Sequence, residues 1–410
     1  MVLILATLLS LIFMYESRLK LTNHLLALLL PWLLILLFSK YDISNLWKEL
    51  EIYTYVVIFS FIIFYYFGYK FVQIFYRYKP KYQITNIGVK ILIFDVIVSV
   101  YLFLTILNIA LAGYIPLVSL MSTGNSGYMD FGISGLYGFY NAFANALGIL
   151  AYYLFLNTTK SIRKYKYLAI TILILLVFVL FMTRQNIISL LVEMFIVYSF
   201  VRKDISYLRV FIFLSLLLLF FDMAGNARTA DIFAIAEIKD KYYWLPSIVI
   251  WLYSYFYTNI VNLNNSINFT DTPYYDGSSF SELLPNVLKN WMGLNFEHES
   301  FLEKINFTVS SAVNQLYTDF GLIEVILMAF IFSFLASVYL KKIKYHPNSF
   351  LYIGIYSVLF FCSLFSFFVN FWFYLPIVFQ LPMIYFLNKL VFRRRIHASN
   401  QKDINNNPHI

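Results

Sequence analysis

Residues 89–112 read VKILIFDVIVSVYLFLTILNIALA, an apolar run with one lysine at its start and a single carboxylate, Asp95. A run of about 20 apolar residues is long enough to cross the hydrocarbon core of a bilayer as a helix. Similar runs recur along the 410-residue chain, which is 61% hydrophobic and only 12% charged. Membrane-spanning strands would need alternating polar residues, which these runs lack. The pattern therefore predicts an all-α, polytopic helical integral membrane protein.

Eleven transmembrane helices are expected from the apolar runs. They are predicted at residues 1–15, 21–39, 52–75, 89–112, 134–156, 167–183, 185–201, 208–224, 311–340, 349–369 and 373–391. Clusters of Lys and Arg occupy alternate connections and begin at Arg18, Arg77, Arg163, Arg202, Lys341 and Arg393. Because basic connections stay in the cytoplasm, this alternation places the N-terminus outside and the C-terminus inside.

The longest connection, residues 226–310, is predicted to be one large extracytoplasmic loop. It follows the first eight spans (1–225) and precedes the last three (311–391), and its density of charged side chains requires a lipid-free environment. Its apolar segment 245–259 is expected to form an interfacial or re-entrant helix, since a full span there would break the charge alternation. The Asn-rich run 262–268 indicates a turn. Residues 392–410 are expected to be a polar cytoplasmic tail.

Composition also excludes several functional classes. The net charge of +9 resides mainly in the clusters between spans, where it determines topology, so nucleic acid is not an expected partner. Cys362 is the only cysteine, which excludes a disulfide framework and a thiolate metal site. No spacing typical of metal ligands or of a phosphate-binding glycine loop is found, so neither a metal nor another cofactor is expected.

Two arginines, Arg184 and Arg228, are the only ones of ten outside the predicted cytoplasmic clusters. Arg184 lies between two spans with almost no linker, and Arg228 follows the end of the next outward-ending span. A guanidinium group binds phosphate oxygens in a bidentate manner and keeps its charge, so two at similar depth suit a diphosphate. The alternative is that each extends to lipid headgroups or pairs with a carboxylate such as Asp222.

Several groups are candidates for proton transfer. His298 is the one histidine on the predicted outer side, between Glu297 and Glu299, where it is either a proton acceptor or an ordinary solvated loop residue. Adjacent residues do not share a helix face, so these three do not predict a metal site. Asp319, at the loop's exit, and Glu193, within a span, are candidates because intramembrane carboxylates are costly.

Aromatic residues make up 21% of the chain. Many are expected at the membrane interfaces, where tyrosine and tryptophan gather. Others lie in the large loop, including Tyr255 and Tyr257, and rings with hydroxyl groups also suit stacking against sugars.

The order of these features resembles the Wzy-type oligosaccharide repeat-unit (O-antigen) polymerases of bacterial surface-polysaccharide assembly. The local matches are Thr183-Arg184-Gln185, the segment 255–263 and the segment 314–321. That family has ten to fourteen spans, one large late extracytoplasmic loop and an arginine at a tight outer turn. This sequence departs from it at Met182, where a Gly-Ser or Thr-Gly pair is common.

The resemblance implies a metal-independent glycosyltransferase of the bacterial inner membrane, with its active site facing the periplasm or exterior. It implies that lipid (undecaprenyl) diphosphate-linked repeat units are joined by attack of a sugar hydroxyl on an anomeric carbon, releasing lipid diphosphate. On this expectation Arg184 and Arg228 bind the diphosphate. The acceptor is deprotonated by Asp319, Glu297 or His298, and the sugar is contacted by Tyr255, Tyr257, Asn262 and Tyr317. The implied partners are lipid-linked oligosaccharides, membrane lipids and a chain-length regulator protein.

Two other classes stay open. An O-antigen ligase shares the late loop and outer arginines and differs in its acceptor. A flippase or other transporter would place functional charges at the bilayer midplane and carry paired repeats, whereas the charges here gather outside.

Overall fold

The computed structural model describes residues 11, 15, 21–78, 82–128, 130–133, 135–202, 215, 231–294, 296 and 298–398. Helices account for 71% of the structure, which confirms the all-α class at the coarse level. The predicted spans at 1–15 and 208–224 lie outside the described residues, apart from residues 11, 15 and 215, and so do Arg228 and Glu297.

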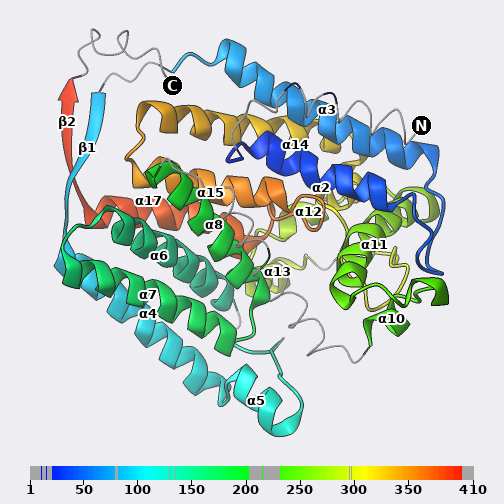
Figure 1. Ribbon diagram of the computed structural model, residues 1–410, viewed down its shortest axis with the longest axis horizontal. Coiled ribbons are helices and arrows are strands. Elements are labelled where there is room, and N and C mark those ends of the chain that lie inside the picture. The colour runs from blue at the N-terminus through cyan, green and yellow to red at the C-terminus, as the bar shows by residue number, and fades with distance from the viewer. Residues whose placement is uncertain are drawn as a thin grey trace. The chain divides into compact units, whose positions relative to one another are not determined.

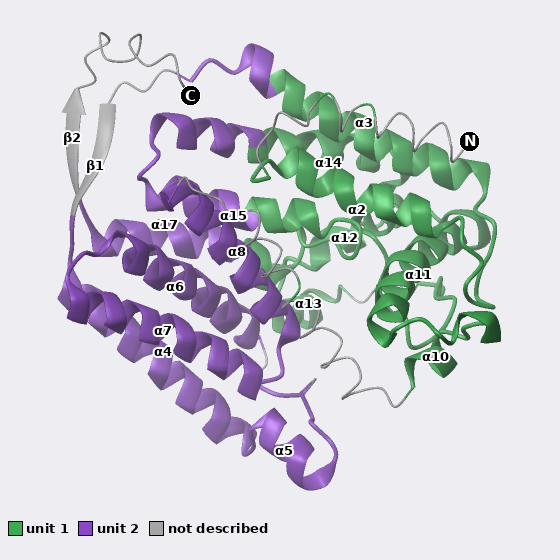
Figure 2. Cartoon of the chain, in the orientation of Figure 1, with its two compact units in different colours: residues 1–71, 204–336, 359–378 green, residues 72–203, 337–358, 379–410 purple. Residues whose placement is uncertain are grey.

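The chain forms two compact units, each built from distant segments (Figures 1 and 2). Unit 1 comprises residues 1–71, 204–336 and 359–378, and unit 2 comprises residues 72–203, 337–358 and 379–410. Three helices contribute residues to both units, namely α3 (Ile52–Phe75), α14 (Ala312–Tyr345) and α15 (Phe350–Leu364).

Unit 1 contains the described part of the predicted large loop together with apolar helices. Besides its parts of α3, α14 and α15, its helices are α2 (His24–Phe38), α10 (Ile232–Ile235), α11 (Ser247–Phe269), α12 (Ser278–Ser281), α13 (Asn286–Met292) and α16 (Leu375–Val378), with a short 3-10 turn η1 (Asp240–Tyr242). Helix α11 packs on α2, where Phe38 contacts the rings of Tyr253 and Phe256. Helix α3 approaches α14 closely at Gly68, because a Cβ atom there would lie 2.5 Å from the carbonyl oxygen of Phe330.

Unit 2 is a helical bundle centred on α6 (Tyr137–Asn157). Its other helices are α4 (Ile91–Ala112), α5 (Pro116–Thr123), α7 (Ser161–Leu180), α8 (Arg184–Arg202) and α17 (Gln380–Val391). Helix α6 contacts α4, α7, α8 and α17, and most of its residues are buried. Gly148 permits close packing, since a Cβ atom there would lie 2.9 Å from the side chain of Leu190.

Five helices within the described residues are long and apolar enough to cross a membrane: α3, the α4–α5 segment Ile91–Thr123, α6, α8 and α14. Shorter apolar helices are α2, α15 and the segment Leu375–Val391. Every predicted span that lies within the described ranges coincides with a helix, or with the pair α16 and α17 at 373–391. Helix α7 is not among these five, because three basic residues, Arg163, Lys164 and Lys166, occupy its first turns. The structure thus has the character of a membrane-embedded helical protein.

Three local features differ from the sequence predictions. The Asn-rich run 262–268, predicted as a turn, instead continues α11. Residues 392–398 of the expected polar tail form strand β2 (Phe392–Ala398), which pairs antiparallel with β1 (Tyr82–Val89). Helix α14 is interrupted at Phe320 and Gly321, and Gly321 has φ +68°, a left-handed conformation that glycine adopts without steric cost.

Candidate functional site

The site lies within unit 1 and is built on the polar face of α11. Asn262 is fully buried, and its amide nitrogen donates to the carbonyl oxygens of Phe307 (2.9 Å) and Val309 (2.8 Å). Its amide oxygen accepts from the backbone N–H of Glu303 (2.8 Å). The Asn262 side chain therefore pairs with three backbone groups of the irregular segment 303–309. These bonds compensate for the low helix propensity of asparagine at this position.

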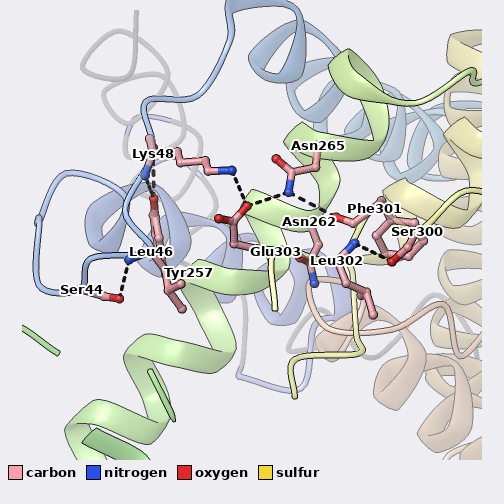
Figure 3. A network of polar contacts seen from close by, with 10 residues as sticks. All are labelled: Ser44, Leu46, Lys48, Tyr257, Asn262, Asn265, Ser300, Phe301, Leu302 and Glu303. Atoms are coloured by element: carbon pink, nitrogen blue, oxygen red, sulfur yellow. Dashed lines mark hydrogen bonds and ion pairs between the residues drawn. The ribbon is translucent and has the colours of Figure 1, made fainter. Parts of the chain in front are cut away.

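Glu303 is the centre of a second set of contacts on the same helix (Figure 3). Its carboxylate accepts from Lys48 Nζ (2.5 Å) and from the Asn265 amide (2.9 Å), which also donates to the Phe301 carbonyl (3.3 Å). Figure 3 shows Lys48 and Asn265 converging on this carboxylate from different segments. The contacts hold segment 301–303 against α11.

Tyr257, predicted as a sugar contact, is buried and hydrogen-bonds to the backbone of Lys48, the residue whose side chain pairs with Glu303. Its hydroxyl accepts from the Lys48 backbone N–H (2.5 Å) and donates to the Lys48 carbonyl (3.0 Å). Burial raises the pKa of this hydroxyl well above its ordinary value, and the hydrogen bond with the Lys48 backbone offsets only part of that rise. The hydroxyl thus remains protonated and ties segment 46–48 to α11.

Asp319, predicted as a catalytic carboxylate, holds a loop in place. It is fully buried and accepts from the backbone N–H of Gly277 (2.6 Å), the backbone N–H of Ser279 (3.2 Å) and the Ser279 hydroxyl. Backbone N–H groups of Tyr274 and Tyr275 donate to the carbonyls of Thr318 and Asp319, both at 2.8 Å. We call residues 274–279 with this carboxylate the Asp319 latch.

Asp276, a residue of the latch, pairs with a histidine outside it. His298 Nε2 lies 2.7 Å from a carboxylate oxygen of Asp276, and the imidazole stacks on the Tyr274 ring at 3.9 Å between centroids and 10° between planes. Partial burial would raise the pKa of Asp276, but hydrogen bonds from His298 and Ser278 outweigh it and lower that pKa below its ordinary value. An ionised Asp276 at Nε2 favours the proton on that nitrogen, so Nδ1 carries the lone pair.

Next to this pair lies a cavity of ≈ 690 Å³, a size typical of small-molecule sites. Its wall includes His298, the rings of Phe296 and Phe301, and an ion pair between Glu282 and Lys289 at 2.8 Å. Most of the remaining lining carries hydroxyl or amide groups, among them Ser279, Thr308, Ser311, Asn314, Gln315 and Asn370. Aromatic rings beside neutral hydrogen-bonding groups suit a sugar better than a nucleotide or a lipid tail.

The other predicted site residues lie elsewhere. Arg184 is the first residue of α8 in unit 2, directly after a tight turn in which the Thr183 N–H donates to the Phe178 carbonyl (3.1 Å). Tyr255 stacks near Trp251 and Phe368, and the largely buried Tyr317 packs edge-on against Tyr53. Neither tyrosine lines the cavity, and neither do Tyr257 or Asn262. Arg228 and Glu297 lie outside the described residues.

Glu193 is fully buried in α8 of unit 2. It accepts from the Ser189 hydroxyl (2.8 Å), and the Gln380 amide, in its hydrogen-bonding orientation, donates to it at 3.1 Å. Within the described ranges, no group of three or more His, Cys, Asp or Glu side chains is arranged to hold a metal ion.

Asp276, Ser279 and Asn370 were not predicted as site residues. No motif in the sequence connects Asp276 to His298, 22 residues later. No protein-family model matches the chain, and neither a curated protein nor a solved structure gives a match.

Proposed function

We propose that the chain is a membrane glycosyltransferase that polymerises oligosaccharide repeat units linked to lipid diphosphate, with the cavity of unit 1 holding the acceptor sugar. The observation that carries the proposal is His298, which is paired with Asp276 and lines a cavity whose wall also carries hydroxyl, amide and aromatic groups. A sugar hydroxyl in this cavity would meet a proton acceptor and neutral hydrogen-bonding partners together. The order of sequence features resembling repeat-unit polymerases supports the same reaction.

In the proposed reaction, Nδ1 of His298 takes the proton of the acceptor hydroxyl while its oxygen attacks the anomeric carbon of the donor. The bond from that carbon to the diphosphate oxygen breaks, and lipid diphosphate leaves with the electron pair. Asp276 holds the imidazole in the required tautomer and stabilises its protonated form. A positioned base of this kind contributes about 10²–10⁴-fold in rate.

The latch geometry favours His298 over Asp319 as the base. The Asp319 carboxylate already accepts three hydrogen bonds from Gly277 and Ser279, and its side chain has no exposed surface. In the proposal Asp319 is a positioning residue, because it fixes the loop that carries Asp276. Glu297 is an alternative base next to His298 in the sequence.

Arg184 and Arg228 are the proposed ligands of the diphosphate. Two guanidinium groups would stabilise the charge that develops on the leaving group, which is the largest electrostatic demand of the reaction. Tyr255 and Tyr317 stay candidates for contacts with more distant sugars.

The proposed topology has eleven spans, an outer N-terminus and residues 226–310 on the outer face of the bacterial inner membrane. One observation supports a position of this region outside the hydrocarbon core: none of α10 to α13 is among the candidate spans of the described residues.

The test is the glycan chain-length profile of a deletion strain complemented with variants. Wild type should restore long chains, whereas His298→Gln and Arg184→Ala should leave single repeat units. Asp276→Asn should shorten the chains. Asp271→Asn is the matched control, because Asp271 is exposed on the same segment.

Normal ladders in both His298→Gln and Arg184→Ala would refute the proposal. Loss of attachment to the final acceptor with long chains intact would instead indicate a ligase. Repeat units trapped on the cytoplasmic side in the deletion strain would indicate a flippase.

A further inference from the structure

Helix α13 of unit 1 carries an apolar face whose side chains are all exposed. They are Val287, Leu288, Trp291 and Met292. At about 100° per residue these four positions fall within an arc of about 140°, and Trp291 is 82% exposed. Lys289 lies outside this arc, lines the cavity and pairs with Glu282 at 2.8 Å. A contiguous exposed apolar face of this kind marks a contact with lipid or with protein.

The backbone fixes the two ends of α13. The carbonyl oxygen of Pro285 accepts from the N–H groups of Leu288 (2.8 Å) and Lys289 (3.0 Å). Gly293, at φ +66°, ends the helix, and the Leu294 N–H donates to the Lys289 carbonyl (3.0 Å). An isolated helix shorter than about 12–15 residues is only marginally stable in water. Because α13 has seven residues, it depends on contacts made by its side chains.

Helix α14 shows where the bilayer begins. Between Gly321 and Ala336 its exposed side chains are all aliphatic and recur at every fourth position, at Ile323, Leu327, Ile331 and Leu335. Such a stripe suits contact with lipid tails. Lys341, the first basic residue of α14, comes 20 residues after Gly321. That length is about 30 Å of helix, which equals the thickness of the hydrocarbon core. The interruption of α14 at Phe320 and Gly321 therefore lies at one boundary of that core.

The Asp319 latch holds the chain before α13 at this boundary. The Tyr275 N–H donates to the Asp319 carbonyl (2.8 Å), and the exposed Tyr275 ring lies edge-on to the Phe320 ring, with 6.3 Å between centroids. Tyrosine is enriched at this depth in membrane proteins. Helix α12 ends at Ser281, and Pro285 follows four residues later, a distance that the chain spans with at most about 14 Å. Helix α13 therefore begins close to the membrane boundary.

The size and composition of the apolar face favour lipid over a protein partner. A stable protein interface buries about 800 Å² on each partner and uses about 20–30 residues of each. The apolar face of α13 has four. A tryptophan with aliphatic neighbours on one side of a helix, and polar residues on the other, is typical of helices that lie in the plane of the bilayer surface.

We propose that α13 is an interfacial helix, which inserts its apolar face into the lipid surface at the boundary marked by Phe320 and Gly321. Because Lys289 on another side of the same helix lines the cavity, this contact holds that part of the cavity wall at the depth of the lipid headgroups. The inference goes beyond the proposed function and stands whether or not the protein joins repeat units.

The experiment measures the depth of α13 by electron paramagnetic resonance of the full-length protein in nanodiscs of phosphatidylcholine and phosphatidylglycerol. The only cysteine is buried, and Cys362→Ala provides the background. Nitroxide labels are attached through Val287→Cys, Met292→Cys or the matched control Asn286→Cys, an exposed position on the polar side of α13. The first two labels should collide more with oxygen, which concentrates in lipid, than with a water-soluble nickel complex. The control label should show the reverse.

Two results would overturn the proposal. Collisions dominated by the nickel complex at all three positions would place α13 in water. Few collisions with either reagent at the two apolar positions would show that protein covers this face.

Hydrogen–deuterium exchange is a second readout that needs no label. Trp291→Lys should raise the exchange of the α13 amides about tenfold or more, because the variant loses the burial of one aromatic side chain in lipid. Trp244→Lys makes the same change at another exposed tryptophan of unit 1 and should leave α13 unaltered. Wild-type exchange of α13 in Trp291→Lys would contradict the insertion of this face.

Discussion

Replacing Asp319 with asparagine should release the Asp319 latch without unfolding the helices around it. The carboxylate accepts from Gly277 N–H, Ser279 N–H and the Ser279 hydroxyl. Asparagine keeps one acceptor oxygen and turns the other into an NH₂ group that faces donors. A hydrogen bond to a charged group contributes about 1.5–3 kcal/mol, so the loss of at least one such bond should destabilise the latch by about 2–3 kcal/mol.

Hydrogen–deuterium exchange of the segment that contains Gly277 and Ser279 measures this loss directly. A change of about 2–3 kcal/mol raises the open population of the latch by about 30-fold to 140-fold, since 1.4 kcal/mol is a factor of ten. Exchange of these amides should accelerate by the same factor, while helices such as α11 keep their protection. Asp271→Asn, the same change at an exposed position, should leave the exchange unaltered.

The exchange result also separates two roles for Asp319. A catalytic base and a positioning residue both predict lost polymerisation in Asp319→Asn. Only the positioning role predicts faster exchange at Gly277 and Ser279. Unchanged protection together with lost polymerisation would refute the latch and return Asp319 to the list of proton acceptors.

Four further predictions concern stability. Asn262→Ala should lower the free energy of unfolding by about 3 kcal/mol, because three backbone groups lose their hydrogen-bond partner; an unchanged melting temperature would contradict this. Glu193→Gln should melt near wild type because an amide can still pair with Ser189, whereas Glu193→Leu should lose about 1–3 kcal/mol. Met182→Gly should raise stability by about 1 kcal/mol, since Met182 has φ +57°; a lower melting temperature would show that its packing matters more. Because the pKa of Asp276 is lowered by folding, its contribution is complete above the unfolded pKa and is lost as pH falls through the folded pKa. Asp276→Asn should therefore reduce the fall in melting temperature at acid pH. The same fall in the variant as in wild type would refute the pairing of Asp276 with His298.

The helices were predictable from the sequence because long apolar runs have few alternatives in a membrane. Residues 52–75 were predicted as a span and form α3 with the same bounds. The pairing of β1 with β2 was not predictable, since it joins segments about 300 residues apart by backbone bonds that leave no periodic pattern. The run 262–268 was misassigned because asparagine favours turns locally, whereas bonds to segment 303–309 stabilise it as a helix.

The candidate site was predictable only in part. His298 stood out as the one histidine on the predicted outer side, and the structure places it on the cavity wall. Its partner Asp276 lies 22 residues away in an irregular segment, and contacts of this kind depend on loop conformation. Asn262 was named through the family resemblance and Asp319 as an intramembrane carboxylate, but the sequence could not distinguish a side chain that binds substrate from one that satisfies backbone groups.

The most direct test of the central claim is a reaction with the purified protein in proteoliposomes and a lipid diphosphate-linked repeat unit as the sole substrate. Wild type should produce a ladder of longer glycans and release one lipid diphosphate for each new linkage, and His298→Gln should slow both by about 10²-fold or more. Translocation of the intact repeat unit without any new linkage, or an undiminished ladder in His298→Gln, would contradict the account.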